Sequence, residues 1–168
     1  MLQICRRFSD LDVPKLMEVY RQSNLENAAF FYPRLSSAEG LFLVEEDFRD
    51  YLREDFFQRS GAFYCLWLED GRILSALRLE PYEDGLLLQA LETHPDYRKQ
   101  GCARKLMEAV QQLLEEQTVY SHVSKENRPS LAVHRRCGFA VHKDSARYLD
   151  GSVSANAWTL RWSPTMKK

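Results

Sequence analysis

The spacing of hydrophobic positions changes in the middle of the chain. Residues 86–91 are almost all apolar, as expected of a strand that is covered on both faces. Beyond Pro95, apolar residues recur at helical spacing with polar residues between them. These helical apolar positions are Ala103, Leu106, Met107, Val110, Leu113 and Leu114. The pattern predicts a buried strand, a short turn over residues 98–103 and an amphipathic helix.

The same criteria divide the rest of the chain. Strands are predicted to include Ile4 and Phe8 and to cover residues 62–68, 73–80, 86–91, 118–123, 139–148 and 154–162. Helices are predicted from Ser9 or Asp10 to about Asn24, over 38–58, from Ala103, and over 128–137. A strand–helix–strand crossover makes residues 118–123 parallel to residues 86–91. An antiparallel meander before one parallel crossover predicts an α/β fold with a mixed sheet.

Length and composition favour one globular domain. The 168 residues, 45% apolar and 28% charged, suffice for one sizeable core. A formal net charge of −1 gives no reason to expect nucleic acid as a partner. No apolar run approaches the roughly 20 residues of a membrane span, so no membrane association is predicted. Four scattered cysteines without a C-x-x-C pair argue against a zinc or dithiol site and predict a cytoplasmic location.

The turn between the buried strand and its helix suits an anion. The first amides of a helix lack internal partners and lie at the positive end of its dipole. Gly101 permits a positive φ and a close approach of a ligand to the backbone, and Ala103 is small. Arg98, Lys99 and Arg104 add positive charge. A diphosphate would fit here; the alternative is an ordinary tight turn with a basic surface.

The sequence Arg98-x-x-Gly101-x-Ala103, between an apolar strand and an amphipathic helix, resembles the acyl-CoA pyrophosphate loop of the GNAT acyltransferase superfamily. Residues 94–97, His-Pro-Asp-Tyr, also lead into the loop as in many members. The resemblance implies that acetyl-CoA is the co-substrate. It further implies a cofactor-binding segment made of Arg98, Lys99, Gln100, Gly101, Cys102, Ala103 and Arg104.

A second segment, residues 127–139, resembles a later motif of the same family. There an Asn, a small residue and a Tyr recur at steps of three and four before Gly-Phe, and Asn127, Ser130 and His134 stand at those positions. Such steps place all three on one side of a helix. The resemblance implies that Asn127 and Ser130 face the CoA arm and that the third position lies near the thioester sulfur.

His134 departs from the family pattern, which has Tyr at this position. An imidazole can donate a hydrogen bond and can carry a proton near neutrality, so His134 is a candidate general acid for the leaving thiolate. Two alternatives stay open. His134 is a buried structural histidine, or the thiolate departs without an acid.

Acetylation of an amine also requires a base, because an ammonium has no lone pair. Glu92, at the end of the central strand, and Glu80, on the neighbouring strand, are the candidates, and each is alternatively a solvated strand-end charge. The family resemblance implies that backbone groups of Leu91 and Thr93 pair with the acyl carbonyl and pantetheine. The chain shows no spacing of His, Asp and Glu that suggests a metal site.

The aromatic run Phe30-Phe31-Tyr32 has two interpretations. It belongs to the core, or it lines a pocket for an acceptor that is apolar or carries an aromatic group.

The sequence as a whole predicts a GNAT-like mixed, mostly antiparallel sheet of six to seven strands flanked by about four helices. One domain, 1–168, would contain an N-terminal strand and acceptor-side helices (1–60), a central sheet with the CoA loop (61–123) and a C-terminal helix and hairpin (124–163).

The predicted activity is transfer of an acetyl group from acetyl-CoA to a primary amine by direct attack in a ternary complex. The alternatives are a catalytically reduced acyl-CoA-binding or regulatory domain and a small α/β interaction domain without a CoA site. The acceptor, a small-molecule or peptide amine, the acyl chain and the choice of monomer or homodimer are left open by the sequence.

Overall fold

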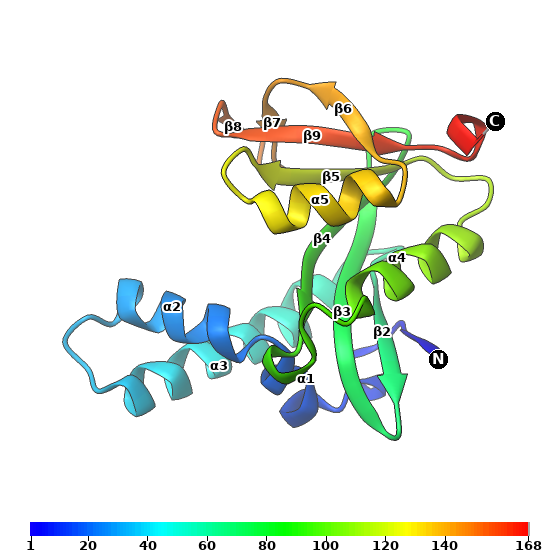
Figure 1. Cartoon of the computed structure of the whole chain (residues 1–168). Helices are drawn as coiled ribbons and strands as arrows, with labels where there is room; N and C mark the ends of the chain where they lie inside the picture. Colours follow the sequence, from blue (N-terminus) through cyan, green and yellow to red (C-terminus); the bar gives the residue numbers. More distant parts are fainter. Residues whose placement is uncertain (168) are drawn as a thin grey trace.

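A seven-stranded mixed sheet runs through the molecule (Figure 1). The computed structural model describes residues 1–167, in which the strand order is β1-β2-β3-β4-β5-β9-β6. The strand bounds are Leu2–Cys5 (β1), Phe63–Glu69 (β2), Arg72–Tyr82 (β3), Gly85–Thr93 (β4), Val119–Ser124 (β5), Ala140–Lys143 (β6) and Ala157–Trp162 (β9). Two short strands, β7 (Ala146–Arg147) and β8 (Val153–Ser154), form a separate ribbon. Only β4 and β5 pair in parallel among the described strands, which confirms the predicted crossover.

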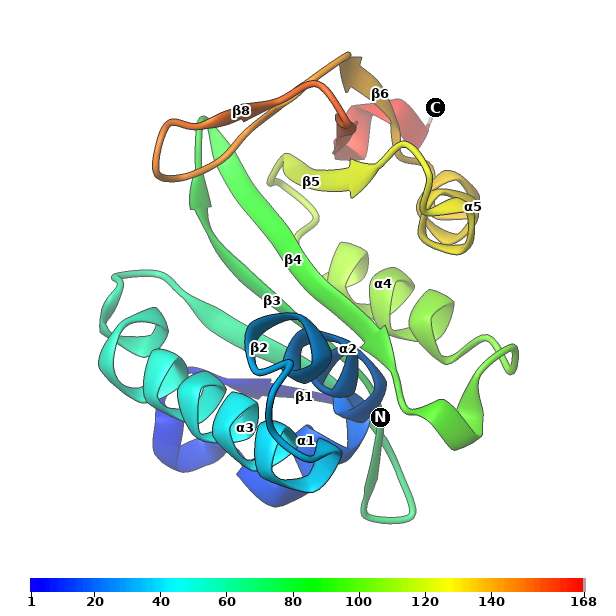
Figure 2. The same ribbon diagram turned by 90° about the vertical axis from the view of Figure 1, so that its left-hand side faces the viewer.

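Helices cover both faces of the sheet. Their bounds are Val13–Val19 (α1), Arg21–Phe31 (α2), Ser37–Glu54 (α3), Cys102–Leu113 (α4) and Arg128–Arg136 (α5). Figure 2 shows α1–α3 on one side of β2–β4, with α4 and α5 on the other side. The predicted α/β fold of the GNAT type is confirmed.

Each face of the sheet carries its own hydrophobic core. On one face, Leu106 and Met107 of α4 are almost completely buried against β2–β5 and β9. On the other face, Leu16 of α1 and Leu52 of α3 pack on β2 and β3. Each such side chain contributes roughly 1.5–3 kcal/mol relative to an exposed one. Because both faces are covered, β4 needs apolar residues on both sides, which explains the apolar run in the sequence.

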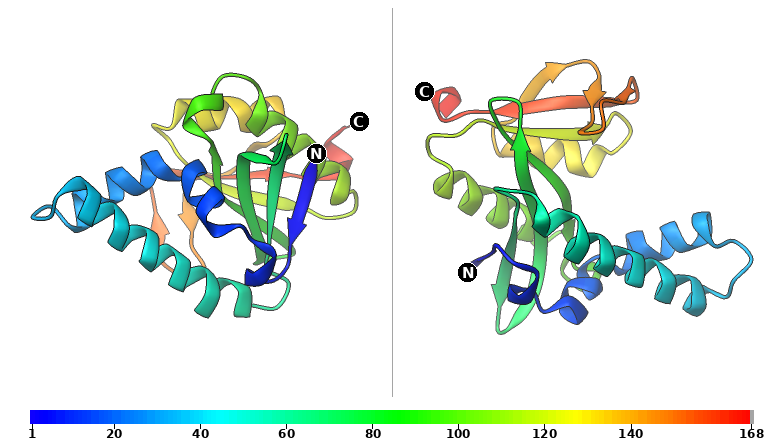
Figure 3. Two further views of the ribbon diagram at one scale, coloured as in Figure 1. Left: turned by 90° about the horizontal axis from the view of Figure 1, so that it is seen from below. Right: turned by 180° about the vertical axis from the view of Figure 1, so that it is seen from behind.

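Helices α2 and α3 form a hairpin that projects beyond the sheet (Figure 3). The α3 helix begins with a capping box, in which Ser36 Oγ accepts from the amide of Glu39 and the Glu39 carboxylate accepts from the amide of Ser36. Gly40 lets the two helices approach closely, since a Cβ at this position would lie only 3.2 Å from the Cβ of Ala28. The hairpin therefore holds itself together at a distance from the main cores.

The predicted N-terminal elements were wrong in two respects. Phe8 lies in a 3-10 turn (Phe8–Asp10) and not in the first strand, because the Asp10 carboxylate accepts from the amides of Arg6 and Arg7 and turns the chain. The helix predicted to end near Asn24 begins later, at Val13, and is followed at Tyr20 by a break and then by α2.

Two further boundaries differ from the predictions. The helix predicted over residues 38–58 ends at Glu54 and is followed by a 3-10 turn, Phe56–Gln58. The predicted C-terminal hairpin is interrupted: β6 and β9 pair directly, whereas the chain between them forms the β7–β8 ribbon. The Asp150-Gly151 turn is present, with Gly151 at a φ of 85°.

Candidate active site

The parallel strands β4 and β5 pair over only three residues each. Leu86–Leu88 lie beside Val119–Ser121, and beyond these residues both strands continue without pairing to each other. Figure 1 shows β4 running towards α1 while β5 runs in a different direction. The two strands therefore diverge beyond these residues. We call the place where they separate the opening, and residues 89–93 of β4 lie on one side of it.

A bulge interrupts β4 where it borders this opening. Gln89 lies opposite Arg78 of β3, and Glu92 lies opposite Ala76, so that two residues of β4 face only one residue of β3. Ala90 has a φ of 52°, a conformation that costs a non-glycine residue on the order of 1–3 kcal/mol. Because directly opposed residues share a face, the bulge brings Gln89 and Glu92 to the same side of the sheet.

Two tyrosines hold the bulge from the side of α1–α3. The Tyr20 hydroxyl, just after α1, donates to the carbonyl of Ala90 at 2.6 Å, and the Tyr64 hydroxyl of β2 donates to Tyr20 at 3.2 Å. Burial, and then the neighbouring Tyr64, raise the pKa of Tyr20, so that it stays a neutral donor. Neither tyrosine was predicted from the sequence. The available signal was that a buried tyrosine hydroxyl usually requires a hydrogen-bond partner.

The predicted CoA loop follows the C-terminal end of β4, shortly after the bulge. After a 3-10 turn (Pro95–Tyr97), Gly101 caps α4 with a φ of 79°, and no side chain accepts from the first amides of the helix. A Cβ at Gly101 would meet nothing within 4 Å, so the space beside this residue is open. Cys102 is buried, its carbonyl accepts from Ser75 Oγ at 3.1 Å, and burial raises the pKa of its thiol. The turn has the backbone that the sequence predicted.

Arg98 connects this loop to the acceptor-side helices. Its guanidinium donates to the Gln22 side chain of α2, lies 3.5 Å from the carbonyl of Thr93 and 3.9 Å from the Glu92 carboxylate. Gln22 was not predicted from the sequence. Arg104 is farther along α4 and pairs with Glu108 at 2.7 Å on the exposed surface. Of the predicted loop arginines, only Arg98 thus reaches the bulge.

The predicted residues of α5 lie together. Asn127 caps the helix by accepting from the amide of Ser130 at 3.2 Å. His134 Nδ1 lies 2.7 Å from the carbonyl of Ser130, and Nε2 lies 2.9 Å from the hydroxyl of Ser121 on β5. Since a carbonyl only accepts, Nδ1 donates; in the neutral ring Nε2 then accepts from Ser121. Ser121 was not predicted from the sequence.

The hydrogen bonds of His134 affect its predicted role as the general acid. His134 is only 1% exposed, and burial lowers its pKa, so the neutral ring is favoured. In that state the one ring proton is held by the Ser130 carbonyl, and Nε2 has no proton to donate. The interpretation of His134 as a buried structural histidine fits these contacts. The general-acid role of His134 stays a prediction that requires the protonated ring.

The two candidate bases lie in different surroundings. Glu80 is 2% exposed and its carboxylate lies 2.6 Å from Arg59; it is opposite Leu87, before the strands diverge. The alternative that Glu80 is a solvated strand-end charge is therefore wrong. Glu92 is partly exposed beside the bulge. Burial raises the pKa of its carboxyl, while a hydrogen bond from Ser23 and then the charge of Arg98 oppose the shift. Which of the two is the base stays a prediction.

The aromatic run lies at the far end of α2. Phe30 and Phe31 are 78% and 66% exposed, and the Tyr32 hydroxyl donates to Asp47 at 2.7 Å. The interpretation of Phe30 and Phe31 as core residues is wrong, because the projecting hairpin leaves that side of α2 uncovered. Their role in acceptor binding stays a prediction.

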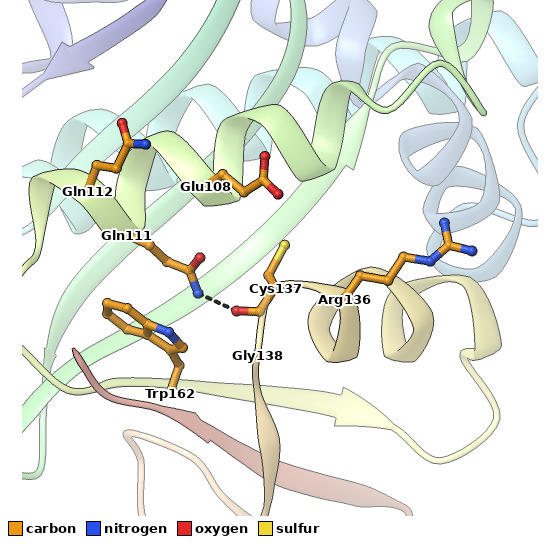
Figure 4. Close-up of a pocket in the computed structure, with 7 residues that line it drawn as sticks. All are labelled: Glu108, Gln111, Gln112, Arg136, Cys137, Gly138 and Trp162. Atoms are coloured by element: carbon orange, nitrogen blue, oxygen red, sulfur yellow. Dashed lines mark hydrogen bonds between the residues drawn. The ribbon is translucent and has the colours of Figure 1, made fainter. Parts of the chain in front are cut away.

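A cavity of about 370 Å³ lies elsewhere, between the second half of α4, the end of α5 and β9 (Figure 4). Gln111 Nε2 donates to the carbonyl of Cys137 at 2.6 Å beside it, and Trp162 lines another side. Burial raises the pKa of the Cys137 thiol to about 11, so that this thiol stays protonated. None of the predicted site residues lines this cavity, so we do not assign the active site to it.

Diverging parallel strands, a bulge on one of them and an open glycine turn at a helix N-terminus together define the class of acyl-CoA-dependent acyltransferases. Residues 17–139 match the acetyltransferase (GNAT) family, and the chain therefore belongs to this family. The family resemblance and the acyltransferase class predicted from the sequence are thereby confirmed. A comparison with the curated proteins gave no match.

Solved structures share the fold over nearly the whole chain. The PaiA N-acetyltransferase of Thermoplasma acidophilum, in complex with coenzyme A, is 15% identical with a TM-score of 0.66, covering 97% of this chain and 99% of that one. The ribosomal-protein-S18-alanine N-acetyltransferase of Escherichia coli is 20% identical with a TM-score of 0.57, covering 96% and 92%. An N-acetyltransferase of Staphylococcus aureus is 13% identical with a TM-score of 0.58, covering 98% and 99%.

No group of three or more His, Cys, Asp and Glu side chains in the described part of the chain is placed to hold a metal ion. Among the helices of residues 1–167, none combines the length and the apolar character that crossing a bilayer requires.

Proposed function

We propose that the protein transfers an acetyl group from acetyl-CoA to a primary amine, which attacks the thioester directly while both substrates are bound. The observation that carries this proposal is the opening between β4 and β5. The bulge at residues 90–91 of β4 borders it, and the start of α4, which has no side-chain cap, follows β4. The coenzyme A in the complex of the Thermoplasma relative supports the choice of co-substrate.

The diphosphate of acetyl-CoA would bind at the N-terminus of α4. The amides of Cys102 and Ala103 have no partner within the helix, and the helix dipole favours an anion in front of them. Gly101 leaves room for the phosphates because it has no Cβ. Lys99, Gln100 and Arg104 would add exposed positive charge and hydrogen-bond donors around this space.

The pantetheine arm would pass between β4 and α5 towards the bulge. Leu91 lies in the bulge, where the register with β3 is interrupted, and beyond the segment that pairs with β5, so its amide would polarise the acyl carbonyl. Backbone groups of Thr93 would pair with the arm on one side, and Asn127 and Ser130 of α5 would border it on the other. The amine nitrogen would form a bond to the carbonyl carbon as the carbon–sulfur bond breaks.

Glu92 is the better-supported base of the two candidates. Glu92 lies next to the bulge that borders the opening. The raised pKa of its carboxyl makes it a stronger proton acceptor than an ordinary carboxylate. Glu80 is already held by Arg59 and lies opposite Leu87, about four strand residues or roughly 13 Å from Leu91. Glu92 would remove the proton of the incoming ammonium, so activity would rise with pH through its pKa.

For His134 we propose a positioning role. Its two ring nitrogens join the Ser130 carbonyl of α5 to the Ser121 hydroxyl of β5, which fixes α5 beside the opening. The predicted general-acid role is the alternative, and it would require a protonated ring in a buried position.

A second candidate function is acyl-CoA binding without turnover. The observation that favours it is the neutral His134 ring, whose two nitrogens are both hydrogen-bonded. The ring then has no proton to donate to the leaving thiolate. Binding of acetyl-CoA without acetylation of any amine in a broad panel would support this function over the first.

The test is calorimetric titration of acetyl-CoA into the wild type and into Gly101→Glu, followed by an amine panel that measures release of free CoA thiol. We expect the variant to lose binding, because the new carboxylate occupies and repels the diphosphate position. Gly151→Glu is the matched control: Gly151 also has a positive φ, and a Cβ there would likewise meet no atom within 4 Å, but it lies in the β7–β8 turn. Absence of binding by the wild type would overturn both candidate functions.

A further inference from the structure

Arg78 carries a positive charge on the acceptor side of the bulge and has no role in the proposed acetyl transfer. It lies in the middle of β3, on the face covered by α1–α3, and it is half-buried. Its guanidinium carbon lies 5.0 Å from the centre of the Tyr51 ring and 5.6 Å from that of Phe56. Its Nε donates to Gln89 Oε1 of β4 at 3.3 Å. The guanidinium also hydrogen-bonds to the hydroxyl of Tyr64. The side chain is thus held in one place by aromatic rings, an amide and a tyrosine hydroxyl.

No carboxylate neutralises this guanidinium within residues 1–167. The two acidic residues on the same face have other arginine partners: Glu80 is 2.6 Å from Arg59, and Glu92 is 3.9 Å from Arg98. Removing a charged group from water costs free energy unless an opposite charge compensates for it. An acidic group on a ligand would supply that compensation, and a guanidinium can bind a carboxylate through two parallel hydrogen bonds.

Arg78 and Glu92 lie on either side of the bulge on one face of the sheet. Glu92 is opposite Ala76, which is two residues along β3 from Arg78, a separation of roughly 7 Å. Both charges act on Tyr20, the residue that holds the bulge carbonyl: Arg78 lowers the pKa of Tyr20 and Glu92 raises it, although burial and Tyr64 have the larger effects. A positive and a negative group therefore lie near the Leu91 amide where the acyl carbon would be.

We propose that the acceptor is a free α-amino acid, whose carboxylate binds Arg78 while its amine is next to Glu92. This inference rests on the proposed acetyl transfer. The ammonium and carboxylate groups of an α-amino acid are only two bonds apart. Such a ligand fits between Arg78 and Glu92, whose side chains lie on either side of the bulge. The amide bond of a peptide or protein N-terminus lacks the negative charge that Arg78 would bind.

The experiment compares matched acceptors in the acetyl-CoA thiol-release assay. Each L-amino acid of the common twenty is assayed beside its primary amide and, where it exists, its decarboxylated amine. For the best acceptor we expect kcat/KM for the acid to exceed that for the amide by at least about tenfold, because only the acid pairs with Arg78. An amide or a decarboxylated amine that equals or exceeds every acid would overturn the proposal.

Substitutions of Arg78 test whether the preference for an acceptor with a carboxylate depends on this residue. Arg78→Met should lower the ratio of kcat/KM for the amino acid to kcat/KM for its amide by at least about tenfold, while Arg78→Lys should keep part of the preference. Arg6→Met is the matched control, because Arg6 also stacks on an aromatic ring, 4.9 Å from the centre of Phe63, but is exposed and follows β1. Equal loss of activity towards acid and amide in a folded Arg78→Met would contradict the inference.

Calorimetry with acetyl-CoA separates this inference from the proposed function. A protein that binds acetyl-CoA and acetylates amines without a carboxylate retains the proposed function and loses the inference. A protein that binds no acetyl-CoA loses both. If Arg78→Met does not fold, the wild-type acid and amide comparison together with Arg78→Lys decides the question.

Discussion

The two sides of the opening between β4 and β5 are built in different ways. The proposed diphosphate site on the CoA side consists of consecutive residues, 98–104, whose backbone amides and one glycine would bind the ligand. The acceptor side consists of side chains from α1, α2, β3 and β4; Tyr20 and Ala90, which share a hydrogen bond, are 70 residues apart. A site made of backbone is local, whereas a site made of side chains depends on the whole fold. A local backbone site can be recognised in a sequence, whereas a site assembled from distant side chains cannot.

Glu92→Gln should have the largest effect on the acceptor side. A neutral amide cannot accept the ammonium proton, so we expect kcat to fall about 10²–10⁴-fold with the Kd of acetyl-CoA unchanged. In the wild type, burial raises the pKa of Glu92 above the ordinary 4.5. A base must be ionised, so activity should be lost as pH falls through that raised pKa, and kcat against pH measures this.

The control for this variant is Glu116→Gln, an exposed residue beyond α4. It should retain wild-type activity. A loss of acetyl-CoA affinity as large as the loss of kcat in Glu92→Gln would show that the charge serves binding and not proton transfer, and would contradict the assignment.

Tyr20→Phe should have the next largest effect. Loss of the hydroxyl leaves the partly buried carbonyl of Ala90 without this donor, which should cost about 1–3 kcal/mol of unfolding free energy. The bulge would then relax, and displacement of the Leu91 amide should lower kcat by on the order of tenfold or more. Urea unfolding and thiol release measure the two effects.

Tyr120→Phe is the matched comparison, since the Tyr120 hydroxyl donates to Asp84 at 2.5 Å near the end of the β3–β4 hairpin and away from the bulge. It should change kcat little. If Tyr20→Phe loses stability but keeps full kcat, the tyrosine supports the fold and does not position the bulge.

The contrast between the two sides also explains which features the sequence could predict. The buried strand, the turn at Gly101 and helix α4 follow from apolar spacing and turn chemistry in one continuous segment. The break at Tyr20 and the bulge at Ala90 do not, because each depends on a hydrogen bond to a distant part of the chain. Arg78 resembles any polar strand residue until Tyr51 and Phe56 are placed beside it. The interpretation of Phe30 and Phe31 as core residues is wrong because composition does not show that a helical hairpin projects.

His134→Gln should affect pH dependence more than the rate at neutral pH. Burial lowers the pKa of His134 below 6.5 in the folded protein, so the unfolded chain binds more protons between the two values. The stability contributed by the neutral ring is complete above about pH 6.5 and is lost as pH falls through the folded pKa. The variant should therefore show a flatter loss of unfolding free energy in urea between about pH 7 and pH 5.

His122→Gln is needed beside it, because burial also lowers the pKa of His122. The same pH series separates the two roles of His134 by the alkaline side of the kcat profile. A general acid would make kcat fall as pH rises through its pKa, and His134→Gln would remove that fall. A positioning residue would give no such fall in the wild type.

Arg98→Met should have the smallest effect, and it tests whether the two sides of the opening are linked. Arg98 is the loop residue that contacts Gln22 and Glu92, but it is exposed, and exposed ion pairs contribute only about 0–1 kcal/mol. We expect the Kd of acetyl-CoA to rise by about three- to tenfold at low salt, with the difference from wild type shrinking as salt is raised. Loss of the guanidinium also removes a positive charge near Glu92, so the pKa seen in the kcat profile should rise. If that pKa stays unchanged while Kd rises, Arg98 acts only on the CoA side and the two sides work independently.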